Sequence, residues 1–266
     1  MKLYDLLLEV AKGPKAVILA GAPGAGKSTV VGDALKGKDL TILNIDDIYV
    51  PLLKQRGVSL DMKNHTPEER STQAATMWDA KKEYEEKVSS AIANKENVVI
   101  DGTAASKKAT LELVDGLKEA GYDVMMLYVY VSLEQSLARN EKRFEKSGGE
   151  DRSLPPAIVL STWSSVTSNF DDYADYFGDR FVAVNNAGDE ALTTKSVEDL
   201  LDKYVTPFAP KNTKPQTDAQ KAAKAKRKAK DREKIANFMK QDNVQKFIEK
   251  SVSPEEAQRT LTQFLS

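Results

Sequence analysis

The sequence contains no cysteine and only one histidine among its 266 residues. Disulfide bridges, thiolate metal sites and cysteine nucleophiles are therefore excluded, and one histidine cannot build a metal centre. Long apolar runs are also missing: the longest, residues 124–131, is far too short to span a bilayer. The start, MKLYDLLLEVAKG, has acidic residues inside its apolar stretch and no cleavage-site pattern. We expect a cytoplasmic protein without a membrane partner, in agreement with a reducing compartment.

The whole chain has almost no net charge, but parts of it carry a clear excess of one sign. Residues 211–234, which we call the basic segment, carry ten Lys/Arg and three Asp/Glu, a net of +7. Residues 235–266 carry four of each sign, and since the total is −1, the first 210 residues carry −8. The basic segment predicts either a solvated linker or an exposed basic helix. It is a candidate for contact with nucleic-acid backbone, although no interleaved aromatic residue indicates base stacking.

Short apolar segments alternate with helical patterns along most of the chain. We predict strands at residues 16–20, 40–45, 97–101, 123–131 and 179–186. We predict helices at residues 2–12, 27–35, 67–94, 106–120, 132–146, 155–175, 196–204, 235–250 and 253–265. This alternation predicts an α/β fold, a doubly wound sheet of five parallel strands. The predicted domain spans residues 1–208, followed by a basic linker or exposed helix over 209–234 and a small helical element over 235–266.

The stretch ILAGAPGAGKSTVV, residues 18–31, has three glycines within six residues, where a predicted strand ends and a predicted helix begins. Its Gly-x4-Gly-Lys-Ser spacing matches a phosphate-binding loop in the required strand–helix context. Glycines let backbone N–H groups point into one concavity, and the following helix adds its positive end. We expect ATP to contact Gly21, Ala22, Gly24, Ala25, Gly26, Lys27, Ser28 and Thr29. Lys27 would reach the β- and γ-phosphates, and the Ser28 hydroxyl would hold Mg²⁺.

Carboxylates follow two of the predicted strands. NIDDIY places Asp46 and Asp47 after the second strand, and NVVIDGT places Asp101 at the end of the third. Phosphoryl transfer needs a group that takes the proton of the acceptor hydroxyl, and Asp46 is our candidate base. Asp47 is then the cap of the next helix, or the two roles are exchanged; capping is the alternative for Asp46 also. Asp101 is a candidate Mg²⁺ ligand, with capping of the helix near Ser106 as the alternative.

Three arginines are candidates for contact with the transferring phosphate. Arg139 and Arg143 lie four residues apart on one predicted helical face, and Arg152 follows a Gly-Gly break. Planar guanidinium groups suit the charge that spreads over phosphoryl oxygens. Closure of such a lid would exclude water. The alternative is a solvated helix face.

GAPGAGKST followed by NIDDIY resembles the P-loop kinases grouped around polynucleotide kinase and the zeta toxins, over about residues 15–205. The resemblance implies the strand order 2-3-1-4-5, a lid with an R-x3-R helix, and Asp46 as the base. It also implies that Asp101 and Thr103, in a strand of the form hhhDxT, lie at the metal and the acceptor. The family often has Arg three residues after the base, where this chain has Tyr49.

Residues 152–186, with RSLPP, a tryptophan helix, YFGD and VNN, also resemble phage-encoded kinases related to the zeta toxins. Some of those kinases phosphorylate 5-hydroxymethyluracil in DNA. The resemblance implies that Asn185 and Asn186 lie where the fold contacts adenine, with plain turn residues as the alternative. It implies that acceptor contacts come from residues 49–75, where Arg56 and Arg70 are candidates. It implies the host cytoplasm as the location if the chain is phage-encoded.

The two tryptophans and the one histidine have plain structural explanations. Trp78 and Trp163 both sit in predicted helices, so that core packing is expected, with an acceptor groove as the alternative for Trp78. His65 lies in a polar loop and is expected to be a loop residue and not a catalytic base.

The sequence therefore predicts an ATP-dependent phosphotransferase with an alcohol group as acceptor. The favoured acceptor is a nucleic-acid hydroxyl, either 5-hydroxymethyluracil in DNA or a polynucleotide 5′-hydroxyl. One alternative is a zeta-toxin-like kinase of a UDP-sugar or another small metabolite. A second alternative is an ATP-dependent switch or assembly protein that is not a kinase.

Overall fold

The computed structural model describes residues 13–187, 217–219, 221–223, 225, 226, 229, 230, 233 and 250–266. The helices predicted at residues 2–12 and 196–204, and nearly all of the one at 235–250, lie outside the described residues. The division into three regions stays a prediction. The described positions between 218 and 233 are helical and exposed.

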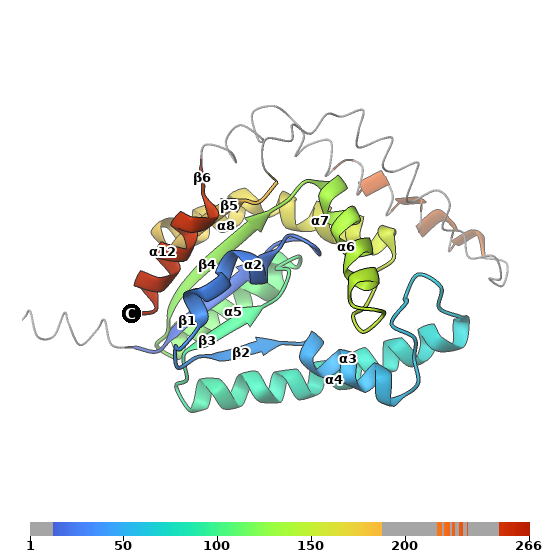
Figure 1. Cartoon of the computed structure of the whole chain (residues 1–266), viewed down its shortest axis with the longest axis horizontal. Coiled ribbons are helices and arrows are strands. Elements are labelled where there is room, and N and C mark those ends of the chain that lie inside the picture. The colour runs from blue at the N-terminus through green and yellow to red at the C-terminus, as the bar shows by residue number, and fades with distance from the viewer. Residues whose placement is uncertain are drawn as a thin grey trace, which may run out of the picture.

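Six parallel strands form the sheet, in the order β2-β3-β1-β4-β5-β6 (Figure 1). They are β1 (Lys15–Ala20), β2 (Thr41–Asn44), β3 (Val98–Asp101), β4 (Asp123–Tyr130), β5 (Phe181–Asn185) and β6 (Ser251–Val252). The order of the first five confirms the predicted order, and β6 is an addition that the sequence did not predict. Because all strands are parallel, their carboxyl ends meet at one edge, the carboxyl edge, and their amino ends at the other, the amino edge.

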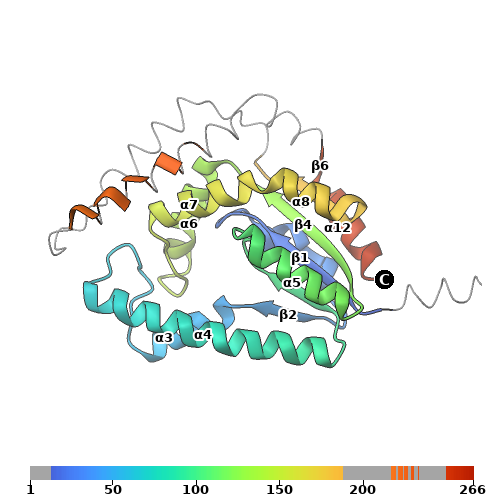
Figure 2. The same cartoon turned by 180° about the vertical axis from the view of Figure 1, so that it is seen from behind.

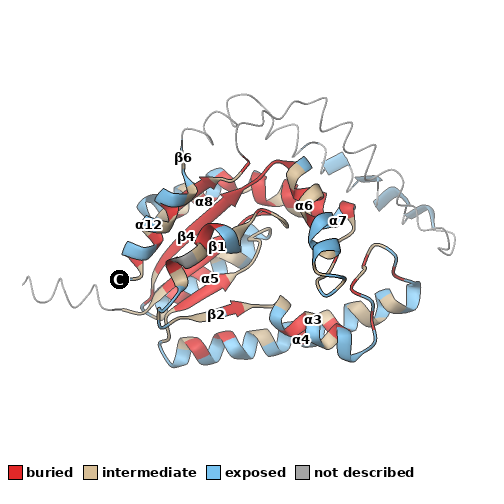
Figure 3. Cartoon of the chain, viewed as in Figure 1, coloured by how far each residue is buried: buried red, intermediate tan, exposed pale blue. Residues whose placement is uncertain are grey.

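Helices cover both faces of the sheet, because successive strand residues point to opposite sides. Ala16 and Ile18 face one core, built with α4 (Pro67–Ala93), α5 (Lys107–Glu119), α6 (Leu133–Lys146), α7 (Pro156–Ser168) and α8 (Phe170–Phe177). Val17 and Leu19 face the other, built with α2 (Lys27–Val31), the short 3-10 helix η1 (Gly32–Leu35) and α12 (Pro254–Phe264). Figure 2 shows α5 and α8 over the first face, and Figure 3 shows the central strands buried between the layers.

The C-terminal residues complete the second face of the sheet. Ser253 caps α12 by accepting the N–H of Glu256 at 3.2 Å, and Pro254 is the first helical residue, as predicted. Ala257 and Leu261 of α12 are fully buried in the core shared with α2 and η1. Residues 251–264 are therefore part of the same sheet and core as the phosphate-binding motif.

Residues 188–250 are attached to this sheet at both ends. The chain leaves β5 after Asn185, and it returns at Ser251, which pairs with Ala183 of the same strand.

Two predicted helices are interrupted. The helix predicted at residues 155–175 is two helices, because Asn169 lies between α7 and α8 and its Nδ2 donates to the carbonyls of Ala104 and Ala105 at 3.5 and 3.2 Å. The helix predicted at 27–35 is α2 followed by η1, with Gly32 at φ +43° between them. The long helix α4 begins as predicted, and Thr66 and Glu69 form a reciprocal capping box there.

The two tryptophans have opposite environments. Trp163 is fully buried, and its Nε1 donates to the carbonyl of Val131 at 2.8 Å, which confirms core packing. Trp78 on α4 is 73% exposed, so core packing was wrong for this residue. Among the described helices, none is long and apolar enough to cross a membrane.

Candidate active site

A cleft of about 960 Å³ opens at the carboxyl edge of the sheet. Its walls come from the phosphate loop (residues 21–28), the ends of β2 and β3, α4, α6, the loop after α6, and α3 (Asp46–Gln55). The lining residues include most of the predicted site: Gly24, Ala25, Gly26, Lys27, Ser28, Asp46, Asp47, Asp101, Thr103, Arg139, Arg143 and Arg152. The topology thus brings together groups from five separate parts of the chain.

The phosphate loop requires glycine for its backbone shape and for close contacts. Gly24 and Gly26 have φ of +73° and +81°, which side-chain-bearing residues rarely adopt. A Cβ at Gly26 would lie 2.6 Å from Nδ2 of Asn186, and one at Gly21 would lie 2.5 Å from the carbonyl of Val129. The glycines therefore let the loop curl tightly against β4 and the end of β5.

Three consecutive carbonyls of the phosphate loop are held by side chains from α6 and from the end of β5. The carbonyls of Pro23, Gly24 and Ala25 accept hydrogen bonds from Ser136 Oγ at 2.6 Å, Arg139 Nη1 at 3.4 Å and Asn186 Nδ2 at 2.8 Å. With its carbonyls held on this side, the loop can turn N–H groups toward the cleft, which is the arrangement that binds phosphate.

Lys27 is the buried cation of the loop. Its Nζ donates to the carbonyl of Gly21 at 3.2 Å. Burial lowers the pKa of this ammonium group, and the carboxylate of Asp101 partly offsets the shift. A buried cation beside a curled glycine loop suits a ligand that brings negative charge.

Two carboxylates, Asp46 and Asp101, line the cleft at the ends of neighbouring strands. Asp101 ends β3, and its register partner on β2 is Asn44, two residues before Asp46. Burial raises the pKa of Asp101, while Lys27 opposes the shift. Asp46 Oδ2 forms an ion pair with Arg152 Nη2 at 2.6 Å. Its Oδ1 is buried, and no described residue gives it a hydrogen bond.

Helix capping does not account for these carboxylates. The N-cap of α3 is Ile45, and no side chain makes the cap hydrogen bond there, so the prediction that Asp47 is the cap was wrong. Ser106 caps α5 by accepting the N–H of Ala109 at 3.4 Å. The capping alternatives for Asp46 and Asp101 are therefore excluded.

Each of the three predicted arginines has a partner within the protein. Arg139 binds the phosphate loop and also donates through Nη2 to the carbonyl of Asn186 at 3.2 Å. Arg143 pairs with Asp151 (Nη2 to Oδ1, 2.7 Å), and this hydrogen bond raises the pKa of the guanidinium group. Arg152 pairs with Asp46. Arg139 thus holds the phosphate loop through hydrogen bonds, whereas Arg143 and Arg152 are paired with carboxylates.

Some predicted residues lie elsewhere or touch the site indirectly. Arg56 does not line the cleft; it donates to Thr76 Oγ1 at 3.0 Å and Asp79 Oδ2 at 2.6 Å and so joins α3 to α4. Asn185 also does not line the cleft, and its Oδ1 accepts the N–H of Ala187 at 3.0 Å. Its neighbour Asn186 is the asparagine that touches the phosphate loop.

His65 is a buried loop residue. Its ring nitrogens lie 3.0 Å from Gln73 Oε1 and 2.6 Å from the carbonyl of Ser59, and it does not line the cleft. The ring therefore shapes the loop before α4, in keeping with the expectation from sequence.

Sequence reasoning missed Asn44, Ser136 and Asp151. Asn44 bridges the two carboxylate-bearing strand ends, Ser136 holds the carbonyl of Pro23, and Asp151 pairs with Arg143. Of the three, only Asn44 has a signal in the local sequence, because an asparagine side chain often bonds the backbone two residues further along the chain.

The donor set of the cleft fits Mg²⁺ better than a closed metal site. Among the described residues, no group of three or more His, Cys, Asp or Glu side chains is arranged to hold a metal ion. Mg²⁺ binds through one or two protein oxygens together with substrate phosphates. The Asp101 carboxylate and the Ser28 hydroxyl, both lining the cleft, are oxygens of that kind.

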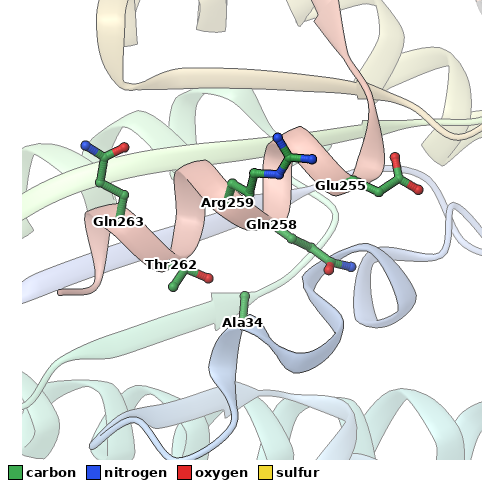
Figure 4. A pocket seen from close by; sticks show the side chains of 6 residues that line it. All are labelled: Ala34, Glu255, Gln258, Arg259, Thr262 and Gln263. Atoms are coloured by element: carbon green, nitrogen blue, oxygen red, sulfur yellow. The ribbon is translucent and has the colours of Figure 1, made fainter.

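A second hollow of about 540 Å³ lies between η1 and α12 (Figure 4). Its wall consists of Ala34, Glu255, Gln258, Arg259, Thr262 and Gln263, and it includes no residue of the phosphate loop or of the strand ends. The groups that suit phosphate chemistry are therefore gathered in the larger cleft.

The chain is similar to a known protein family and to several solved structures. The family model for zeta toxin matches residues 7–197. A solved structure of AvrRxo1-ORF1:AvrRxo1-ORF2 with ATP is 18% identical, with a TM-score of 0.50, and the match covers 98% of this chain and 89% of that chain. A structure from the PezAT toxin–antitoxin system of Streptococcus pneumoniae is 15% identical, with a TM-score of 0.48, and covers 90% of this chain and 94% of that chain. A search of the curated proteins found no match.

Proposed function

The chain belongs to the zeta toxin family, and on that premise we propose that it is a kinase that transfers the γ-phosphoryl group of ATP to an alcohol hydroxyl. One observation carries the proposal: a buried carboxylate oxygen, Asp46 Oδ1, lies without a hydrogen-bond partner among the described residues in the same cleft as Lys27 and the phosphate loop. A cleft for nucleotide binding alone has no need of such a group. The likeness to the fold solved with ATP supports ATP as the donor.

The phosphate loop and Lys27 bind the phosphates. The loop N–H groups and the helix end of α2 hold the β-phosphate, and Lys27 lies between the β- and γ-phosphates. Ser28 and Asp101 would hold Mg²⁺, which supplies charge neutralisation to the phosphates when it is bound. ATP also returns negative charge to the buried ammonium group of Lys27.

Asp46 orients the acceptor and takes its proton. Its Oδ1 accepts the hydroxyl proton as the acceptor oxygen bonds to the γ-phosphorus, and the bond from that phosphorus to the ADP oxygen breaks. Arg152 holds Oδ2 at 2.6 Å, which fixes the orientation of the carboxylate. Asp47 is exposed at the cleft and is the alternative base.

Arg143 and Arg152 meet the transferring group. Both line the cleft, and both are paired with carboxylates there. A γ-phosphoryl group between Lys27 and Asp46 offers them oxygens that carry more charge in the transition state than in ATP, and guanidinium groups bind such oxygens in two-point contacts. Thr103, which lines the same cleft, faces the acceptor.

The favoured acceptor is a nucleic-acid hydroxyl, in 5-hydroxymethyluracil or at a 5′-end. The basic segment, of net charge +7, lies in the chain between two parts of this sheet, β5 and β6. Such a segment attracts phosphodiester backbone to the carboxyl edge. Trp78, highly exposed on α4 and one residue after the cleft residue Met77 in the sequence, offers a ring on which a base could stack outside the cleft.

A transfer assay tests the proposal. γ-labelled ATP is incubated with plain duplex, duplex containing hydroxymethyluracil, 5′-hydroxyl oligonucleotides and UDP-sugars. We expect label on a nucleic acid, and we expect Asp46→Asn to lose transfer while it keeps ATP affinity. Asp79→Asn, which changes an exposed carboxylate outside the cleft, is the control. Asp47→Asn decides which carboxylate is the base. Label on a UDP-sugar would move the acceptor to a small metabolite, and hydrolysis independent of any acceptor would replace the kinase by a switch.

Neutralising the basic segment tests the acceptor class separately. Replacing its lysines by glutamine should weaken DNA binding steeply at low salt and leave the phosphorylation of a small acceptor unchanged. Removing residues 211–266 would be a poor test, because β6 and α12 complete the sheet and its core.

A further inference from the structure

Asn44, at the carboxyl end of β2, connects two groups of the cleft through one side chain. Its Oδ1 accepts the backbone N–H of Asp46 at 2.9 Å, and its Nδ2 donates to Asp101 Oδ2 at 3.1 Å. The first bond fixes the turn from which α3 begins. The second crosses from β2 to β3, where the register places Asn44 directly beside Asp101.

Only a side-chain amide can make both bonds at this position. Aspartate would offer acceptors alone and would meet the carboxylate of Asp101 with a second negative charge. Serine could accept the N–H of Asp46, but it is too short to reach across the strands to Asp101. The identity of the side chain is therefore set by two partners on different strands.

A second asparagine of the same sheet makes a comparable pair of bonds far from the cleft. At the amino edge, Asn97 Oδ1 accepts the N–H of Lys15 at 2.8 Å, and its Nδ2 donates to the carbonyl of Asp39 at 3.4 Å. Both asparagines are half-buried, but only Asn44 lines the cleft. Asn97 thus shows what such a bridge does when no reacting group is attached to it.

We propose that Asn44 is a positioning residue, which holds the carboxylate of Asp101 and the base-bearing start of α3 in one fixed geometry across the floor of the cleft. The inference rests on the proposed function, in which Asp46 takes the acceptor proton and Asp101 holds Mg²⁺. The hydrogen bond from Asn44 fixes the orientation of the Asp101 carboxylate, which would hold Mg²⁺ in the proposed function. Residues that orient metal ligands in this way commonly change affinity or activity by about 10- to 100-fold.

The first test compares Asn44→Ala with Asn97→Ala. Each variant loses one side chain that makes two hydrogen bonds, so we expect similar decreases in melting temperature. Asn44→Ala should lower kcat by about 10- to 100-fold with little change in the KM for ATP, because the phosphate loop is untouched. Asn97→Ala should keep the parent kcat. Equal kcat values for the parent and Asn44→Ala would overturn the proposal, and so would equal losses in the two variants.

A binding measurement decides the proposal even if no acceptor is phosphorylated. Calorimetric titration with ADP at increasing Mg²⁺ gives the Mg²⁺ concentration needed for tight binding. We expect Asn44→Ala to need about tenfold more Mg²⁺ than the parent and Asn97→Ala to need the same amount. Failure of the parent to label any acceptor would refute the proposed function alone. An unchanged Mg²⁺ requirement in Asn44→Ala would refute the role of Asn44 alone.

Asn44→Ser separates the two bonds and serves if the alanine variant does not fold. It retains an acceptor for the N–H of Asp46 and adds no charge, but it loses the donor to Asp101. We expect a melting temperature near that of the parent together with the raised Mg²⁺ requirement. A serine variant indistinguishable from the parent in that requirement would show that the bond to Asp101 has no positioning role.

Discussion

The two edges of the sheet use polar side chains in opposite ways. At the amino edge, Asn97 bonds the start of β1, Thr41 bonds Glu96, and Arg180 pairs with Asp123 at 2.7 Å. At the carboxyl edge, an oxygen of Asp46 is buried without a hydrogen-bond partner among the described residues, and burial disfavours the charged forms of Lys27 and Asp101.

The difference separates stability from chemistry within one sheet. Polar groups at the amino edge satisfy one another, and this favours the folded chain. At the carboxyl edge, buried charges and an oxygen left unpaired within the described residues make the folded state less stable. A ligand that binds these groups would remove this destabilisation, which is a common feature of functional sites. Substitutions of the buried charged groups Lys27 and Asp101 should therefore remove activity without loss of stability, whereas substitutions at the amino edge should lower stability and keep activity.

The largest expected effect is at Lys27. Lys27→Met should lower the rate of phosphoryl transfer by about 10³-fold, because a cation at the transferring phosphate is lost. It should melt at the parent temperature or above it, since a buried charge is removed. Steady-state kinetics and thermal unfolding measure both results, with Lys54→Met, which removes an exposed ion pair with Glu150, as the control. A variant that melts well below the parent would break the comparison between the edges.

Next in size is Phe264, which closes the amino edge. The ring is 8% exposed, and the Lys15 Nζ and the Arg180 guanidinium carbon lie 5.8 and 5.2 Å from its centroid. Phe264→Ala should lower the free energy of unfolding by about 3 kcal/mol through the cavity that it leaves, with kcat unchanged at a temperature where the variant is folded. Denaturant unfolding measures the loss, and Phe264→Leu should show much less of it. A fall in kcat without loss of stability would contradict the assignment of this edge.

A smaller effect concerns Asp101 and pH. Its raised pKa means that the folded chain holds this proton more tightly, so the stabilisation is complete below the unfolded pKa and is lost as pH rises through the folded pKa. Asp101→Asn, measured with a chelator and without nucleotide, should therefore melt above the parent at neutral pH. The gap should close as pH falls toward about 4, the ordinary pKa of an aspartate.

The matched control for Asp101 lies at the other edge. Asp123→Asn breaks the exposed pair with Arg180 and should leave the melting temperature unchanged or slightly lower. A melting temperature of Asp101→Asn that equals the parent value at neutral pH would argue against a costly buried carboxylate.

The smallest effect is expected at Glu96. Its hydrogen bonds from Thr41 and Asn94 lower the pKa of this carboxyl group. The stabilisation is therefore present above the unfolded pKa and is lost as pH falls through the folded pKa. Glu96→Gln should melt slightly below the parent at neutral pH, should lose this difference in acid, and should keep full activity. Thermal scans between neutral and acidic pH check the trend, and a loss of activity would refute it.

Much of the fold could be predicted because its signals are local. The phosphate loop, the Thr66 cap and the apolar strands each lie within a few residues, and the resemblance supplied the order of the first five strands. The sixth strand, Ser251–Val252, is two residues long and has no pattern of its own. The exposure of Trp78 depends on which face of α4 meets the core, and neighbouring alanines and lysines do not show that face.

In the site too, features with a local sequence signal could be predicted and contacts between distant segments could not. The phosphate loop and Asp101 follow strands and could be found from the sequence, whereas their partners are set by contacts between distant segments. Arg152 meets Asp46 across 106 residues, and Asn186 meets Ala25 across 161 residues. From the sequence we could predict that arginines reach the cleft. We could not predict that Arg139 would donate a hydrogen bond to a carbonyl of the phosphate loop.

The hydrogen bonds to the phosphate loop have a thermodynamic consequence. Because Ser136, Arg139 and Asn186 already hold three successive carbonyls of the loop, a nucleotide meets a backbone whose conformational entropy was lost during folding. Association then carries little ordering penalty, and its heat-capacity change should reflect only the surface that the nucleotide covers.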